Sequence, residues 1–174
     1  MIEEGGSELV ETEARWPDSW FTTHDGVRLH YVEIGAGAPV ILLHGIGGSA
    51  VGSWFKNGIA QRLARTNRVL ALDLRGFGPS EGVAAPQDDM SGDVLALLAH
   101  IGEERAHIAG YSMGGGILMR MMAKCPERFI TACFQASGIL ETEEWRDRVP
   151  PDVVGPGPDE TRALAQIRAF EVGA

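Results

Sequence analysis

The amino-acid sequence predicts an α/β fold: a mostly parallel, twisted sheet with helices on both faces, preceded by an N-terminal β-hairpin. Two short, continuously apolar runs, residues 40–43 and 69–72, are typical of strands that are buried on both faces of a parallel sheet. Segments with helical spacing of apolar residues separate these runs from each other and from two further strand-like runs. Strands that alternate with helices form βαβ units with right-handed crossovers, so the runs are expected to share one sheet.

The first part of the chain contains two segments of different character. Residues 1–18 are acidic, poor in apolar side chains and without periodicity, which predicts a disordered lead. Residues 20–23 and 27–32 alternate as strands do, and the Asp25-Gly26 pair between them favours a tight turn. We therefore expect a β-hairpin here and a core domain that spans residues 19–140.

The rest of this core continues the alternation of strands and helices. Strands are predicted at residues 106–109 and 130–136 in addition to the two apolar runs. Helices are predicted near residues 54–65, 91–101 and 116–123, and Pro126 stops the last of them soon after its end.

Residues 141–174 differ in composition from this core. Residues 141–148 are charged, and residues 149–158 contain four prolines and two glycines, which is typical of a linker. Residues 159–171 then predict a short amphipathic helix. Its apolar face is formed by Ala163, Leu164, Ile167 and Phe170.

Charge and composition exclude several classes of function. The formal net charge is -9 and no run of lysine and arginine occurs, so neither a nucleic acid nor an anionic membrane is an expected partner. The N-terminus has no apolar core and is not expected to be a signal peptide. Cys125 and Cys133 lack CxxC spacing and are expected to be buried free thiols, which suits a reducing, cytoplasmic location.

The strongest chemical signal is the sequence Gly-Tyr-Ser-Met-Gly at residues 110–114, between a predicted strand and a predicted helix. In a G-x-S-x-G turn the serine has strained backbone, and side chains in place of Gly110 and Gly114 would collide with neighbouring elements. The turn raises the hydroxyl of Ser112 above the sheet and points the start of the following helix at a developing oxyanion. The alternative is a glycine-rich turn that contains a serine by chance.

Two further loops follow predicted strands. His-Gly-Ile-Gly-Gly at residues 44–48 is rich in glycine and can approach the serine closely, so that the amide of Ile46 could donate to the same oxyanion. Residues 73–80 follow the next strand, and Asp73 and Arg75 are interpreted as residues that order this loop rather than as catalysts.

These three motifs, in this order, resemble the α/β-hydrolase fold family, and the resemblance covers about residues 20–140. The similar branch contains serine esterases, lactonases and related acyl hydrolases; a serine at the turn argues against dehalogenases and epoxide hydrolases, which have aspartate there. The resemblance implies that Ser112 is the nucleophile and that the amides of Ile46 and Met113 form the oxyanion hole. Gly45, Gly110 and Gly114 are expected to let the loop and the turn approach each other. No cofactor is expected, and an open pocket with little cap predicts small carboxylic esters as substrates.

The sequence departs from the family pattern after the nucleophile. In the family an acid and a histidine follow the serine, whereas all five histidines here precede Ser112. The two strands that carry the acid and histidine would lie beyond residue 174, so the domain is expected to be a shortened core and residues 141–174 to resemble the start of a cap domain. Weak activity is therefore expected, because an oxyanion hole alone retains about 10³ to 10⁴-fold acceleration.

Substitutes for the missing base can be ranked by topology. His44 follows a parallel strand next to the one that precedes Ser112, and Asp73 follows the neighbouring strand, so a Ser112, His44 and Asp73 constellation is possible. His100 and His107 belong at the opposite end of the sheet, and His30 in the hairpin is expected to be distant. The alternative for His44 is that it orders the oxyanion loop. The acid could instead come from Glu141, Glu143 or Glu144, although these residues are more readily interpreted as solvated helix charges.

The remaining expectations concern partners, alternative functions and metal binding. The last predicted strand would be an apolar sheet edge, so a homodimer is expected through residues 130–136 or through exchange of the 159–171 helix. A catalytically silent relative that binds a small ligand is one competing interpretation. A dinucleotide-binding domain is another, because residues 45–50 fit G-x-G-x-x-A. No metal site is expected.

Overall fold

A computed structural model describes residues 16–84 and 87–136 of the chain. It contains one six-stranded sheet with the strand order β1-β2-β4-β3-β5-β6. The strands are β1 (Asp18–Thr22), β2 (Arg28–Gly35), β3 (Ala38–Leu43), β4 (Asn67–Leu72), β5 (Ala106–Tyr111) and β6 (Phe129–Gln135). The helices are α1 (Ile59–Leu63), α2 (Gln87–His100) and α3 (Met113–Lys124), with a π-helical turn, η1 (Val51–Phe55), and a 3-10 turn, η2 (Pro126–Arg128).

The predicted hairpin and parallel sheet are both present. β1 pairs with β2 antiparallel, and the turn between them contains Gly26 at φ 84°, which favours glycine. β4, β3, β5 and β6 run parallel, while β2 pairs antiparallel with β4 and attaches the hairpin to the parallel core. The predicted α/β class is therefore confirmed, as a mixed sheet of mostly parallel strands.

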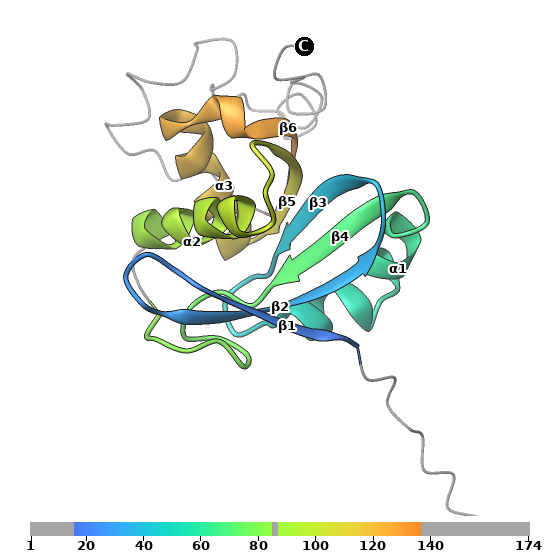
Figure 1. The fold of residues 1–174 in the computed structure, drawn as a ribbon, viewed down its shortest axis with the longest axis horizontal. Helices are drawn as coiled ribbons and strands as arrows, with labels where there is room; N and C mark the ends of the chain where they lie inside the picture. Colours follow the sequence, from blue (N-terminus) through green and yellow to red (C-terminus); the bar gives the residue numbers. More distant parts are fainter. Residues whose placement is uncertain (1–15, 85–86, 137–174) are drawn as a thin grey trace, which may run out of the picture.

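Helices cover both faces of the sheet, because α2 and α3 lie on one face and α1 on the other (Figure 1). Alternate residues of each strand point into two separate clusters: Ile41 and Leu43 of β3 pack towards α2 and α3, whereas Val40 and Leu42 pack towards η1 and α1. The runs at 40–43 and 69–72 are apolar at every position for this reason.

Two helices differ from their predicted boundaries. The helix predicted at 54–65 is instead η1 followed by the short α1, because Gly58 at φ 76° interrupts it. The helix predicted at 116–123 begins earlier, at Met113, directly after the serine. Its first turn is Met-Gly-Gly-Gly, which has no helical apolar periodicity to detect.

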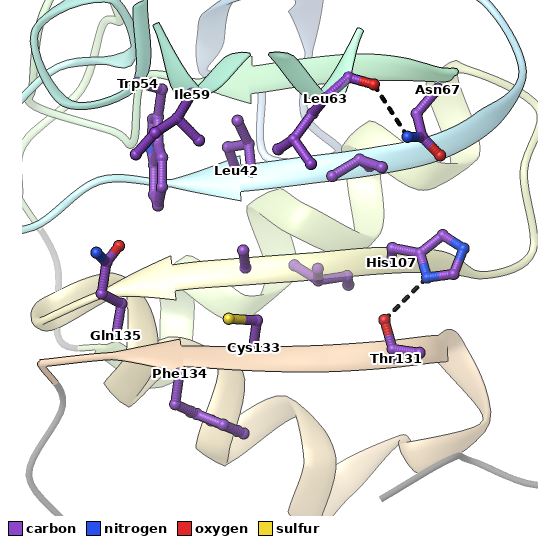
Figure 2. Close-up of a pocket in the computed structure, with 13 residues that line it drawn as sticks. Leu42, Trp54, Ile59, Leu63, Asn67, His107, Thr131, Cys133, Phe134 and Gln135 are labelled. Carbon is purple, nitrogen blue, oxygen red and sulfur yellow. Dashed lines mark hydrogen bonds between the residues drawn. The ribbon is translucent and has the colours of Figure 1, made fainter. Parts of the chain in front are cut away.

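The structure also corrects the prediction for the thiols. Both cysteines are free, but Cys125 is only half-buried and Cys133 is exposed. Cys133 lies on β6, where it lines a groove together with residues of β3, β5 and α1 (Figure 2). The acidic lead up to residue 15, the carboxylates Glu141, Glu143 and Glu144, and the 159–171 helix lie outside the described residues. Among the described helices, none is both long and apolar enough to cross a membrane.

Candidate active site

The carboxyl ends of the parallel strands bring three of the predicted site residues to one edge of the sheet. Asp73 follows β4, His44 follows β3 and Ser112 follows β5. From β3 the chain passes to β4 on one side and later to β5 on the other, so the strand order reverses between β3 and β5. Open α/β sheets bind their ligands at such a reversal, which makes this edge the candidate site.

Ser112 occupies a strained turn between β5 and α3. Its backbone angles are φ 50° and ψ −111°, outside the regions that a non-glycine residue ordinarily adopts. The Ser112 amide donates to the carbonyl of Gln135 at 2.8 Å, which ties the turn to the end of β6. As in any α-helix, the amides of the first turn of α3, including that of Met113, have no partner within the helix.

The two glycines of the motif are required by contact distances. A β-carbon on Gly110 would lie 2.4 Å from the carbonyl carbon of Gly114, and one on Gly114 would lie 2.5 Å from the carbonyl oxygen of Leu43. Real β-carbons do not approach other backbone atoms so closely. These glycines therefore let the start of α3 pack directly against β5 and the end of β3, and the strained serine is held between them.

The loop after β3, which we call the oxyanion loop (residues 44–50), packs against this turn. A β-carbon on Gly45 would lie 2.7 Å from Cδ1 of Tyr111 and 3.3 Å from Cβ of Ser112. Gly48 donates to the carbonyl of Gly45 at 3.0 Å, which closes a turn around Ile46 and Gly47. The side chain of Ile46 is exposed and no hydrogen bond occupies its amide within the described part of the chain.

His44 is fully buried, and both of its ring nitrogens are bonded to the backbone. Nε2 accepts a hydrogen bond from the amide of Leu74 at 3.1 Å, so Nδ1 carries the proton and donates to the carbonyl of Gly45 at 2.7 Å. Burial lowers the pKa of His44, which keeps the ring neutral. The histidine thus lies beside the serine turn but is used to hold the loop that it begins.

Asp73 is also buried, and its carboxylate bonds two groups other than His44. Oδ2 accepts from Nδ1 of His30 at 2.7 Å, and Oδ1 accepts from the amide of Ala50 at 2.7 Å. In the described structure, therefore, the hydrogen bonds of Asp73 do not orient His44. His30, which we expected to be distant from the site, is the residue that the sheet brings to Asp73.

Sequence reasoning missed His30 because the contact depends on the antiparallel pairing of β2 with β4, which places His30 beside the end of β4. The amide of Asp73 donates to the carbonyl of His30 at 3.0 Å, so the two residues are also joined through their backbones. The signal that could have found it is the histidine itself, a titratable residue within the buried stretch 29–32 of this strand.

Arg75 orders the loop that follows Asp73, as predicted. Its Nε donates to the fully buried carboxylate of Asp93 on α2 at 2.7 Å, and its Nη1 donates to Asp25 in the hairpin turn at 3.0 Å. A hydrogen bond from Thr23 and, to a smaller extent, the hydrogen bond from the Arg75 guanidinium lower the pKa of Asp25 to about 2.

The burial of Asp73 argues against a nucleotide ribose site, for which that carboxylate would have to be accessible.

A groove of about 520 Å³ lies on the sheet face shared by β3, β5 and β6. Trp54 and Gln135 lie near the end at which these strands finish, while His107 and Thr131 lie at the other end, joined by a 2.8 Å hydrogen bond (Figure 2). Ser112 does not line it. His107 is thus far from the serine edge, as the topology predicted.

Known proteins share both the sequence and the fold. The family model described as the alpha/beta hydrolase fold matches residues 38–155. The chain is 36% identical over 144 residues to a dihydrolipoyllysine-residue acetyltransferase component of the acetoin cleaving system of Pseudomonas putida, covering 80% of this chain and 37% of that protein. It is also 36% identical over 96 residues to a soluble epoxide hydrolase of Corynebacterium, covering 53% of this chain and 32% of that protein.

Among solved structures, a thermophilic esterase from Thermogutta terrifontis superimposes with a TM-score of 0.64 at 27% identity. The match covers 74% of this chain and 48% of the esterase. The chain thus spans about a third of the length of the curated relatives it matches and about half of this structure.

Proposed function

Because this chain belongs to the α/β hydrolase fold family, we propose that it is a serine hydrolase that acts on small carboxylic esters, with Ser112 as the nucleophile. The observation that carries this proposal is the strained backbone of Ser112 between two glycines that admit no side chain. A non-glycine residue is held in this conformation only where the surroundings over-determine it, and such positions are concentrated at active sites. The relatives share the hydrolase fold but differ in reaction, so the ester substrate is inferred from the serine and its surroundings and not from the relatives.

The proposed reaction begins with attack by Oγ of Ser112 on the ester carbonyl carbon. The carbonyl oxygen becomes an oxyanion, for which the amides of Ile46 and Met113 are the proposed donors. The hydroxyl proton leaves to a base, the carbon–oxygen bond to the alcohol breaks, and the alcohol departs with a proton. Water then attacks the acyl-serine and releases the carboxylic acid.

His44 is a poor candidate for that base, although it lies at the correct edge. To accept a proton at Nε2 it would have to break the bond from Leu74, and burial already lowers its pKa. We propose that His44 orders the oxyanion loop instead. The proton of Ser112 then goes to a group outside the described residues or to water.

A serine at the turn favours acyl chemistry over epoxide opening. An acyl-serine is cleaved by water at its carbonyl, whereas an epoxide needs an attacking carboxylate to give an ester that water can later cleave. The side chains of Tyr111, next to Ser112 in the chain, and of Ile46, in the loop that packs against this turn, are both exposed and favour a substrate with an apolar acyl group.

A second candidate function is ligand binding without catalysis in the same pocket. The bonding of both nitrogens of His44 to the backbone favours it, because His44 is then not free to take a proton from Ser112. Carboxylate products or small esters would still be held by the amides at this edge.

Hydrolysis of p-nitrophenyl acetate and butyrate by the full chain tests the proposal. We expect a burst of p-nitrophenol, faster for butyrate, that disappears in Ser112→Ala, because no acyl-enzyme can form without the hydroxyl. His107→Gln is the matched control, since His107 is remote from this edge. Equal rates for wild type, Ser112→Ala and buffer, with no labelling of Ser112 by an organophosphorus probe, would leave only ligand binding.

We also propose that the chain pairs with a second copy through β6, the edge strand of the described sheet. The exposed Cys133 near the middle of β6 provides a reporter. In a two-fold antiparallel pair, mild oxidation cross-links Cys133 to its copy, and Cys133→Ser prevents this. A monomer by light scattering at all concentrations contradicts the pairing.

A further inference from the structure

The oxyanion loop is attached to the rest of the molecule at both of its ends, and both attachments come from two consecutive residues after β4. At the first end, the amide of Leu74 donates to Nε2 of His44 at 3.1 Å. At the other end, Oδ1 of Asp73 accepts from the amide of Ala50 at 2.7 Å. The position of the loop relative to Ser112 therefore depends on where Asp73 and Leu74 are held.

Asp73 is held in turn by β2. Besides the bond from Nδ1 of His30 to Oδ2, the amide of Asp73 donates to the carbonyl of His30, and the amide of His30 donates to Oγ of Ser80 at 2.8 Å. The hydroxyl of Ser80 donates to the carbonyl of Asp73, which closes a ring of hydrogen bonds. Gly78 packs so closely over the carboxylate that a β-carbon there would lie 2.4 Å from Oδ1.

His30 lies between two carboxylates in a buried position. Its Nδ1 is bonded to Asp73 and its Nε2 is 3.2 Å from Oδ1 of Asp18 on β1, while the ring of Trp20 packs edge-on against it. Burial disfavours the imidazolium, but the hydrogen bonds and charges of Asp73 and Asp18 outweigh it and raise the pKa of His30. Both ring nitrogens can then act as donors, one to each carboxylate.

We propose that His30 is a positioning residue for the oxyanion loop: by donating from Nδ1 to Asp73, it fixes the carboxylate that holds Ala50 and the chain segment that holds His44. The proposal adds to the proposed function a residue on a strand that contributes nothing else to the site. Its effect on catalysis rests on that proposed function, whereas its effect on the loop does not.

The physical reason is that Asp73 has two oxygens and two long-range donors. Without the donor from His30, Oδ2 becomes a buried, unsatisfied carboxylate oxygen, and the side chain must rotate or recruit water to satisfy it. Rotation breaks the bond to Ala50 and releases one end of the loop. A displacement of about 1 Å in groups that position the reaction can lower a rate by about 10²-fold.

Two substitutions of His30 separate this role from a general loss of packing. In His30→Asn the side-chain amide nitrogen stands close to where Nδ1 was, so the donor to Asp73 is kept. In His30→Gln the longer side chain carries its donor to the position of Nε2, which faces Asp18, and the bond to Asp73 is lost. His107→Gln is the matched control. That histidine also makes one partly buried side-chain hydrogen bond, to Thr131, but it lies at the opposite end of β5.

The readouts are amide hydrogen exchange in the full chain and the rate of acyl-enzyme formation with p-nitrophenyl butyrate. In His30→Gln we expect the amides of Ala50 and Leu74 to exchange about ten-fold faster or more. We expect the acylation rate constant to fall by about 10²-fold with a smaller change in KM, because the oxyanion forms only in the transition state. His30→Asn should restore both quantities to within about three-fold, within the usual spread of one hydrogen bond.

The proposal is overturned if His30→Gln leaves the exchange of Ala50 and Leu74 as in wild type, or if His30→Asn is as impaired as His30→Gln. It is also overturned if His107→Gln changes the same two amides equally. If the wild-type chain shows no burst at all, the proposed hydrolase function fails, and the exchange data alone still decide the role of His30.

Discussion

The serine turn (residues 110–114) and the oxyanion loop pack against each other at the carboxyl end of the sheet, yet they are built by different means. The turn is held by backbone packing within five consecutive residues, where Gly110 and Gly114 leave no space for a side chain. The loop is held by side-chain hydrogen bonds from far along the chain: Asp73 is 23 residues from Ala50 and 43 residues from His30. A strained turn needs rigid neighbours, whereas a glycine-rich loop needs external attachments because its own residues do not hold it.

This difference predicts different responses to substitution. The turn stores about 1–3 kcal/mol of backbone strain at Ser112, which the contacts around it must overcome, so steric changes there should act on the whole fold. The loop should respond mainly to substitutions of the polar groups that hold it. These substitutions should lower stability less than steric changes in the turn do, and they should lower activity more than they lower stability.

The largest effect on stability is expected from Gly114→Ala. The new methyl would lie 2.5 Å from the carbonyl oxygen of Leu43, and because neither backbone can yield, α3 must move away from β3. We expect the free energy of unfolding in urea to fall by about 3 kcal/mol or more. Gly92→Ala on α2 is the control, because no atom lies within 4 Å of its β-carbon, and it should stabilise by about 0.5–1 kcal/mol. Equal stability of both variants would refute the steric account of the turn.

The next largest effect is expected from Asp73→Asn, at the centre of the loop's attachments. The amide must place its NH₂ group against one of two donors, the amide of Ala50 or Nδ1 of His30. We expect a loss of about 2 kcal/mol in urea unfolding and faster hydrogen exchange at Ala50. Asp18→Asn, which changes the other, more exposed neighbour of His30, should have a much smaller effect. A wild-type exchange rate at Ala50 in Asp73→Asn would contradict this attachment.

His44→Phe keeps an aromatic ring, somewhat larger than the imidazole, and removes both of its hydrogen bonds. The amide of Leu74 and the carbonyl of Gly45 then lose their partners, and we expect a loss of about 1–3 kcal/mol. If His44 only orders the loop, the rate of acyl-enzyme formation should fall by about 10²-fold and keep its dependence on pH. A fall as large as in Ser112→Ala, with the rate no longer dependent on pH, would show that His44 is the base after all.

The smallest effect is expected in the dependence of stability on pH, where the two buried histidines act in opposite directions. Burial lowers the pKa of His44 from 6.5, so its contribution is complete above about pH 6.5 and is lost as the pH falls and the unfolded chain takes up a proton. The pKa of His30 is raised from 6.5, so its contribution is complete below about pH 6.5 and is lost as the pH rises through the raised pKa.

Urea midpoints measured across this range should therefore be highest near neutral pH. His30→Asn should flatten the alkaline side and His44→Phe the acid side. The charged groups around His30 are Asp73, Asp18 and, above the ring of Trp20, Arg28, so Asp18→Asn should shift the alkaline side to lower pH. An unchanged alkaline side in His30→Asn would mean that His30 is not charged in the folded chain.

The sequence by itself determined the sheet, the serine turn and the order of the loops, because these depend on short-range rules. Unbroken apolar runs require burial on both faces, Asp25-Gly26 specifies a tight turn, and Gly-x-Ser-x-Gly describes the steric needs of five adjacent residues. The residues of the serine turn and of the loop after β3 were therefore enough to identify the α/β-hydrolase fold family from the sequence.

Only the tertiary structure decided which polar groups meet. A pairing of His44 with Asp73 and one of His30 with Asp73 are equally compatible with the sequence, and the antiparallel register of β2 against β4 selects the second. Likewise, helical periodicity did not show that Gly58 divides one predicted helix, and strand alternation did not show that Cys133 is exposed and lines a groove beside α1. Hydrophobic patterns specify which residues are inside, but hydrogen bonds between buried polar groups depend on distances of a few ångströms that the whole sheet sets.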